Sequence, residues 1–231
     1  MVLTAPMSSL ALEVLDQLDA AVALAPEWEV LARACALDPE AAAISCGRTG
    51  GTNLGRFTGD EVGALLLGEG SRVPAWPGHD GYRPDHATVE VALHHLRTAR
   101  PRFLFVSLGD ADELAHHGDY RGYLAALRLA DATIGRIQAE VGGWGEEGRH
   151  VTIAVTTDHG RCADFGDHGR ECPESARAFF IAGGGRVPRR GVVDLREPVD
   201  LRDSAPTLRV LAGIAPAVDP PPAGDGVGVP I

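Results

Sequence analysis

The stretch from Val151 to Gly169, VTIAVTTDHGRCADFGDHG, decides the fold of this chain. Its first five residues, Val151 to Val155, are apolar or β-branched and carry no charge, which predicts a buried strand of a parallel sheet. Open α/β sheets bind their ligands at the carboxyl ends of the strands, and there this strand is followed by Asp158 and His159. A divalent cation accepts such a carboxylate and imidazole. Taken alone, the pair also fits a helix-capping aspartate beside a surface histidine.

A second strand of the same kind lies upstream. Residues 103–108, FLFVSL, are apolar, and GDADELAHHGDY follows them directly. Asp112 and His116 in this segment are four positions apart, so on a helical turn they share one face. An acidic helix start with incidental histidines is the alternative for this segment alone. Two strands that each end in an Asp and a His, with His168 nearby, instead predict one ligand cluster at one edge of the sheet.

Length and composition indicate one soluble domain. With 231 residues, 45% hydrophobic and 23% charged, the chain is long enough for a single sizeable core. We expect one domain over residues 1–231, with its core at about 80–215 and a flexible Pro/Gly-rich tail at 216–231. The net charge of −11 argues against nucleic acid or an anionic membrane as a partner. Acidic residues interrupt the apolar segment 10–24, so neither a signal peptide nor a membrane span is expected, and we predict a cytoplasmic protein.

The remaining elements follow from apolar periodicity and from Pro and Gly positions. Asp85 is expected to cap an amphipathic helix over 86–99, in which His94 and His95 lie at the surface or rim. The other predicted elements are helices at 8–24, 27–36 and 201–211 and strands at 41–46 and 178–182.

The four cysteines do not have the paired spacing of a structural zinc site. Cys162 and Cys172 flank the His168 segment, so a loop disulfide or a soft metal ligand is one interpretation. Scattered buried thiols in a reducing compartment are the interpretation we favour from sequence.

The ordered set of motifs resembles the alkaline phosphatase superfamily, which includes phosphodiesterases, sulfatases and cofactor-independent phosphoglycerate mutases. The Asp-x-x-x-His motif matches Asp112 to His116, the Asp-His-Gly motif matches residues 158–160, and His168 matches the later lone histidine. The helix at 120–137 with Asp131, and the Asp-x-x-Pro-Thr pattern at 203–207, match two further family elements. The resemblance covers about residues 80–215 and implies a doubly wound, mostly parallel α/β sheet with helices on both faces.

The resemblance also implies a site for two divalent metal ions. Asp112, His116 and His168 would hold one ion, and Asp158 and His159 would supply part of the second site. Two such ions activate an attacking oxygen and neutralise charge on the transferred group. Oxygen and nitrogen ligands suit Zn²⁺ first and Mn²⁺ as the alternative. The expected activity is hydrolysis of a small anionic phosphate monoester or diester.

The amino-terminal part departs from the family pattern. Family members begin with a strand that ends in a metal-binding Asp and then present a Ser or Thr nucleophile, and no such strand is evident here. Thr4, Ser8 and Ser9 are the only hydroxyl residues at a comparable place. The alternative is therefore a truncated or catalytically inactive module of the same fold that binds metal or a partner. A sulfatase is a weaker alternative, because no Cys or Ser stands in the required Cys/Ser-x-Pro-x-Arg context, and a mutase is weaker still, because its inserted domain has no room in this length.

Overall fold

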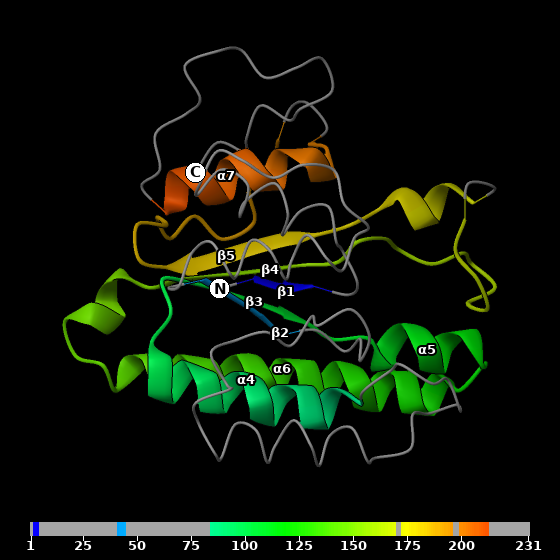
Figure 1. Cartoon of the computed structure of the whole chain (residues 1–231). Helices are drawn as coiled ribbons and strands as arrows, with labels where there is room; N and C mark the ends of the chain where they lie inside the picture. Colours follow the sequence, from blue (N-terminus) through cyan, green and yellow to red (C-terminus); the bar gives the residue numbers. More distant parts are fainter. Residues whose placement is uncertain (1, 5–40, 45–83, 170–171, 196–198, 213–231) are drawn as a thin grey trace, which may run out of the picture.

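Five strands form one sheet in the order β2-β3-β1-β4-β5 (Figure 1). The computed structural model describes residues 2–4, 41–44, 84–169, 172–195 and 199–212. The strands are β1 (Val2–Thr4), β2 (Ala41–Ile44), β3 (Phe103–Ser107), β4 (Thr152–Thr156) and β5 (Phe180–Gly184). The α-helices described are α4 (Asp85–Ala99), α5 (Asp110–His116), α6 (Tyr120–Gly142) and α7 (Ser204–Leu211). Short 3₁₀ turns are η2 (Glu147–His150), η3 (Pro173–Ala176) and η4 (Leu201–Asp203).

The pairing of the strands sets the edge at which loops meet. β3 pairs in parallel with β2 and β1, β1 pairs in parallel with β4, and β5 alone pairs antiparallel, with β4. The carboxyl ends of β1, β3 and β4 therefore meet at one edge of the sheet, where the segments after β3 and β4 begin. Helices and a mixed sheet confirm the α/β class, while the doubly wound arrangement stays a prediction.

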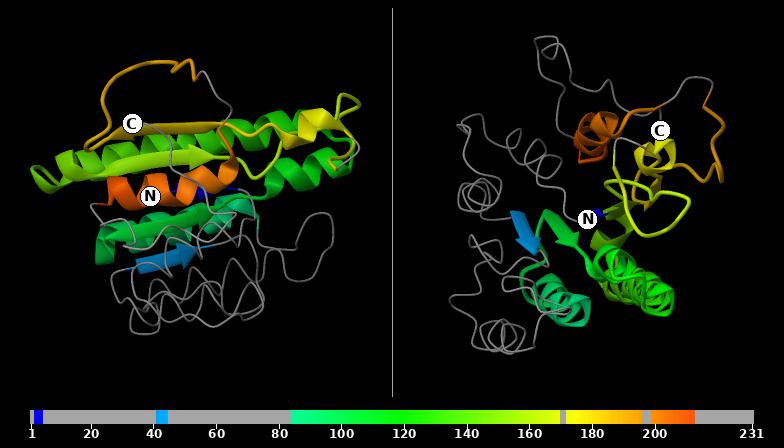
Figure 2. Two further views of the ribbon diagram at one scale, coloured as in Figure 1. Left: turned by 90° about the horizontal axis from the view of Figure 1, so that it is seen from above. Right: turned by 90° about the vertical axis from the view of Figure 1, so that its right-hand side faces the viewer.

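Helices lie on both sides of the sheet in the views of Figures 1 and 2. α4 and α6 run along one face, and α7 lies across the sheet from them, near β5. The core between the helices and the sheet consists of apolar side chains from α4, β3 and α6. Its members are Val89, Val91, Ala92, Leu93, Leu96, Leu104, Val106, Ile137 and Val141.

β1 corrects the sequence-based interpretation of the amino terminus. No strand was evident before Ser8 from the residue pattern, and the sheet was expected to lack that central member. The structure instead places Val2 to Thr4 between β3 and β4, with Val2 opposite Phe105 and Thr4 opposite Ser107. Three residues are too few for a periodic pattern, and pairing on both sides is what makes them a strand. The strand ends in Thr4, so the Asp of the family pattern is still not found there.

Other element bounds shift by small amounts. The strands predicted at 151–155 and 103–108 are found at 152–156 and 103–107. The last strand begins two residues later than predicted. The helix at 120–137 extends to Gly142, and the last helix divides into η4 and α7. Of the remaining predictions, the helices at 8–24 and 27–36 and the tail lie outside the described residues.

α4 differs from its prediction in two side chains. Its N-cap is Pro84, and no side chain caps it, so Asp85 is the first helical residue rather than the cap. His95 is 6% exposed and belongs to the buried face, whereas it was expected at the surface. The face that α4 buries is wider than the apolar stripe in its sequence, because both the sheet and α6 cover it.

No described helix combines the length and the apolar character needed to span a bilayer.

Candidate metal centre

The turn from β3 into α5 is held by a buried carboxylate. Asp85, 2% exposed, accepts hydrogen bonds from the backbone N–H groups of Gly109 and Asp110 at 2.8 and 3.0 Å. In return, the backbone N–H of Asp85 donates to the Asp110 carboxylate at 3.1 Å. The start of α4 therefore fixes the direction in which α5 leaves the sheet.

Asp112 and His116 lie on the same face of α5. Acidic residues occupy the first turn of this helix, where the helix dipole favours them. The distance from Asp112 Oδ2 to His116 Nε2 is 3.5 Å. This geometry follows from the four-residue spacing.

The second part of the site follows β4. Thr156 at the end of the strand donates its hydroxyl hydrogen to Phe179 O at 2.6 Å. Asp158 Oδ1 accepts from the backbone N–H of His159 at 3.0 Å. Gly160 donates its N–H to Ser175 O, and a Cβ at this position would lie 2.3 Å from Glu174 O. Glycine therefore ends the Asp-His-Gly motif because the backbone of η3 passes too close for any side chain.

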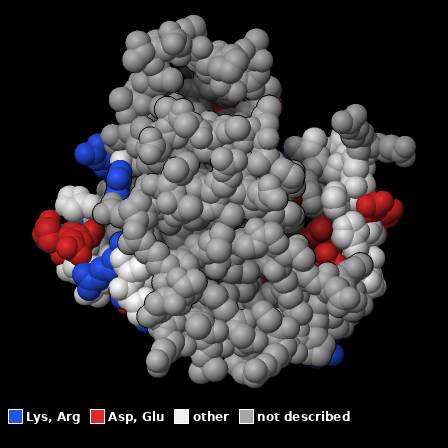
Figure 3. Space-filling model, viewed as in Figure 1, with Lys and Arg blue, Asp and Glu red and all other residues white. Residues whose placement is uncertain are grey.

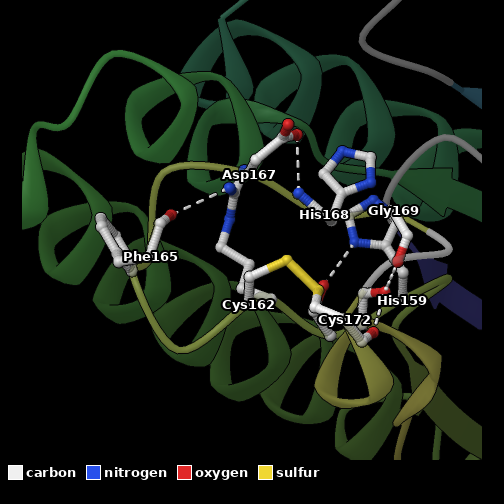
Figure 4. Close-up of a disulfide and its surroundings, with 10 residues drawn as sticks. His159, Cys162, Phe165, Asp167, His168, Gly169 and Cys172 are labelled. Atoms are coloured by element: carbon white, nitrogen blue, oxygen red, sulfur yellow. Dashed lines mark hydrogen bonds between the residues drawn. A yellow bond between two sulfur atoms is a disulfide. The ribbon is translucent and has the colours of Figure 1, made fainter.

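His168 reaches the same place from the next loop. Its Nε2 lies 3.0 Å from His116 Nε2 and 3.6 Å from Asp112 Oδ1. Its ring stacks on that of His159, with centroids 3.7 Å apart and planes inclined by 17°. Figure 4 shows these two rings side by side above the loop.

All five predicted ligands are thus brought together. One ligand atom each from Asp112, His159 and His168 lies within 4.8 Å of the other two. His159 Nε2 is 3.9 Å from Asp112 Oδ1 and 3.6 Å from Asp158 Oδ2. His159 therefore stands between the two predicted groups of ligands, and the tightest set combines members of both.

The predicted hydroxyl candidates are only partly described. Thr4 ends β1 at the same edge of the sheet, opposite Ser107 of β3. Ser8 and Ser9 lie outside the described residues. Ser107 was not singled out from sequence; its Oγ is buried and has no hydrogen-bond partner in the described part of the chain.

Burial shifts the pKa of two titratable groups of the cluster. The pKa of Asp158 is raised, first because burial disfavours its charged form, and also because Asp112 lies near. The pKa of His168 is lowered, first by burial and then by the neighbouring His159. A lowered pKa leaves His168 neutral near pH 7, which is the form that binds a metal ion.

Arg161 was missed by the sequence analysis. Its guanidinium donates to the Asp112 carboxylate at 2.5 Å and to Asp112 O at 2.8 Å. A second nitrogen donates to Phe165 O at 3.1 Å. Arg161 therefore ties α5 to the loop that carries His168. Its position after the Asp-His-Gly motif gave no signal, because a lone arginine in a polar loop is common.

The cysteines also differ from the favoured interpretation. Cys162 and Cys172 form a disulfide with a Cα–Cα distance of 5.5 Å, whereas buried thiols were expected. Sequence offered this pairing only as one alternative, because two cysteines ten positions apart carry no information on whether the loop between them turns back.

The donor set fits a divalent cation. It offers carboxylate oxygens and imidazole nitrogens without thiolate, which is the ligand chemistry of Zn²⁺ and Mn²⁺. His116 and His168 direct the same nitrogen at each other at 3.0 Å, an arrangement in which a shared cation satisfies both lone pairs. Figure 3 shows acidic side chains at the surface of the end that carries α5, which adds an attractive field for cations.

Comparison with known proteins agrees with this chemistry. Residues 71–172 match the model of the Metalloenzyme superfamily. Over this range, somewhat less than half of its length, the chain is similar to that superfamily. All five predicted ligands lie inside the matched range, and the match supports the alkaline phosphatase-like assignment and a role for divalent metal.

One curated relative is similar over a longer stretch. Over 132 residues, 54% of this chain, the sequence is 28% identical to a 2,3-bisphosphoglycerate-independent phosphoglycerate mutase of Natronomonas pharaonis. The match covers 24% of that protein, so the chain spans about a quarter of the length of the curated relative it matches.

Proposed function

We propose that this chain carries the metal site of a phosphoryl-transfer enzyme that hydrolyses small phosphate monoesters or diesters. The observation that carries the proposal is the convergence of Asp112, His116, Asp158, His159 and His168 at the carboxyl edge of the sheet. These side chains come from three separate segments, and His116 and His168 alone are 52 positions apart. Structural ion pairs do not require three imidazoles within contact distance of two carboxylates.

The proposed ligands hold two divalent ions, with Zn²⁺ expected first and Mn²⁺ as the alternative. When bound, such ions neutralise charge on a transferred phosphoryl group and activate the attacking oxygen. The protein's part is to fix the ligands: Asp85 orients α5, Arg161 bridges α5 and the His168 loop, and Gly160 lets η3 pack closely. Preorganisation of this kind is what lowers the barrier in phosphoryl transfer.

The attacking hydroxyl is proposed to come from the amino-terminal segment. Thr4 is the candidate with a described backbone, at the carboxyl end of the central strand. Ser8 and Ser9 are the other candidates. If none of them serves, the chain is a metal-binding module without this chemistry.

The mutase relative favours a second function. A mutase transfers the phosphoryl group to another hydroxyl rather than to water, using the same kind of metal site for the transfer. The sequence analysis disfavoured it because of chain length, but the similarity to a phosphoglycerate mutase is a specific observation in its favour. A sulfatase has no comparable support.

The remaining expectations belong to the same proposal. The substrate is a small anion recognised at the metal ions, without nucleic acid or membrane as partner, and the chain forms one doubly wound domain in the cytoplasm. The net charge of −11 supports a site that depends on bound cations to attract an anion.

The test is turnover of p-nitrophenyl phosphate and of its bis ester by purified protein supplied with Zn²⁺ or Mn²⁺. We expect release of p-nitrophenol that is abolished by EDTA and lowered at least about 100-fold in Asp112→Asn, because this residue contacts three of the other groups. Asp131→Asn, an exposed residue of α6, is the matched control and keeps full activity.

The outcomes separate the alternatives. Loss of activity in Thr4→Ala, Ser8→Ala or Ser9→Ala identifies the hydroxyl. Interconversion of 3- and 2-phosphoglycerate, followed by ³¹P NMR, with no p-nitrophenol release, favours the mutase. Metal binding without turnover of any of these substrates contradicts the proposed enzyme and leaves the inactive module.

A further inference from the structure

The Cys162–Cys172 disulfide closes the loop that contains His168. The two cysteines are ten positions apart; Cys162 follows the Asp-His-Gly motif, and Cys172 directly precedes η3. Figure 4 shows the bond beneath the stacked rings of His159 and His168. The bond therefore joins the two ends of the segment that delivers one proposed ligand.

Three backbone hydrogen bonds inside this loop involve the cysteines. Cys162 N donates to Asp167 O, and Phe165 N donates to Cys162 O, at 3.1 and 2.9 Å. At the other end, Cys172 N donates to Gly169 O at 3.3 Å. The backbone groups that define the turn on both sides of His168 are thus those of the disulfide-bonded residues.

Apart from the disulfide, the described part of the loop is held mainly at Phe165 and Gly169. Ala163, Asp164, Gly166, Asp167 and Gly169 are exposed, so the segment buries little apolar surface. Its described attachments outside the disulfide are Arg161 at Phe165 O, Ser175 Oγ at Gly169 O and Cys172 O, and the ring of Phe165, which packs edge-on against Tyr120 and Tyr123 of α6. A loop with so few buried contacts has low local stability once its covalent closure is removed.

His168 depends on this loop more than the other ligands do. Asp112 and His116 are held by α5, which packs against α6. Asp158 and His159 are the second and third residues after the end of β4. His168 has no helix or strand of its own. Its backbone position opposite His116 and Asp112 is set by the loop.

We propose that the Cys162–Cys172 disulfide is a redox-controlled clamp: in the oxidised form it holds His168 in the metal centre, and its reduction releases His168 and lowers affinity for a divalent cation. The inference rests on the proposed function only in requiring that the cluster binds a cation. It predicts that the thiol–disulfide state of the surroundings sets how much of the protein carries metal.

The chemical step is exchange with a dithiol. A thiolate of the dithiol attacks one sulfur, the S–S bond breaks, and the other cysteine leaves as a thiolate that takes up a proton. The second thiol of the dithiol then displaces the remaining cysteine in the same way. The protein gains two electrons and two protons, and the dithiol becomes a disulfide. Both cysteines are half-buried, and the residue that follows each of them, Ala163 and Pro173, is exposed, so a small dithiol reaches them.

The experiment is titration of the full chain with Mn²⁺, with free Mn²⁺ measured by electron paramagnetic resonance. Mn²⁺ is used because it prefers oxygen and nitrogen ligands, so freed thiols add little binding of their own. The oxidised wild type is compared with Cys162→Ser/Cys172→Ser and, as the matched control, with Cys35→Ser/Cys46→Ser. We expect affinity about tenfold lower in the first variant, the size of effect typical for loss of a group that orients a ligand, and no change in the control.

A second comparison shows that the effect passes through His168. In a His168→Gln background, removal of the disulfide should produce no further loss of Mn²⁺ affinity, because the ligand that it positions is already gone. If removal of the disulfide lowers Mn²⁺ affinity as much in this background as in the wild type, the clamp is contradicted and the effect is a general one on folding.

Wild-type protein provides a test that does not depend on how the serine variant folds. Reduction with dithiothreitol followed by removal of the reductant, with thiols counted by alkylation and mass spectrometry, should weaken Mn²⁺ binding, and reoxidation should restore it. Affinity that stays within twofold in both states overturns the clamp while leaving the metal centre intact. Failure of the oxidised wild type to bind Mn²⁺ or Zn²⁺ overturns the proposed function and the clamp with it.

Discussion

At the scale of single residues, Asp85 shows how a buried acidic side chain directs the chain. Burial, together with the nearby Asp110, raises its pKa to about 8, although two backbone N–H groups that donate to it lower the pKa. The folded protein therefore keeps a proton on this carboxyl group at a pH where the unfolded chain has lost it.

The raised pKa gives a pH dependence with a definite sign. Between about pH 4 and pH 8 the folded state binds one proton more than the unfolded state at Asp85, so its contribution to the free energy of unfolding falls as pH rises through this window. We expect the stability difference between wild type and Asp85→Asn to shift in favour of the variant from pH 4.5 to pH 8. Urea unfolding at several pH values measures it.

The substitution also carries a cost that does not depend on pH. Asn offers one acceptor where Asp offers two, so one of the N–H groups of Gly109 and Asp110 loses its partner, at a cost of about 1–3 kcal/mol. Asp131→Asn, at an exposed position, controls for the change of charge. A stability difference that is constant between pH 4.5 and pH 8 contradicts the assignment.

At the scale of elements, α6 contributes a narrow buried stripe to a core that α4 and β3 dominate. Ala126, Thr133, Ile137 and Val141 are its buried residues, spaced at intervals of seven and four residues as an amphipathic helix requires. Ile137, 1% exposed, packs in the cluster beneath the sheet.

Truncation of this stripe is expected to destabilise the domain without touching the metal centre. Ile137→Ala should lower the free energy of unfolding by about 2–5 kcal/mol, through lost burial and the cavity left behind. Leu127→Ala, on the same helix and 43% exposed, is the control and should cost less than about 1 kcal/mol. Equal effects of the two substitutions, measured by chemical denaturation, would show that α6 does not pack as described.

The elements that sequence predicts are those with a long periodic signal. α4, β3 and β4 were each found within a few residues, because apolar spacing along a helix and a short apolar run are local properties of the sequence. α6 was expected from the family resemblance. β1 was missed because three residues owe their strand to pairing with Phe105 and Ala154, which are distant in sequence. The same limit explains the cysteines, since a disulfide is a property of two chain segments that meet.

At the scale of the whole molecule, the site exists only because the sheet is folded. The order of the strands places the end of β3 and the end of β4 on either side of β1, and each delivers part of the cluster. Sequence spacing predicted which side chains to expect at this edge, because strand ends are recognisable. It did not predict that His159 lies against Asp112 or that Arg161 bonds to Asp112, because these contacts depend on how the two loops turn.

The central claim is that residues from three segments form one divalent-cation site. It is tested most directly by crystals grown with Mn²⁺ or Zn²⁺ and an anomalous difference map collected at the absorption edge of the metal. The account predicts a peak within about 2.0–2.3 Å of ligand atoms from Asp112, His159 and His168, with His116 and Asp158 next to it. Metal bound at full occupancy elsewhere, with these five side chains left without a peak, would contradict it.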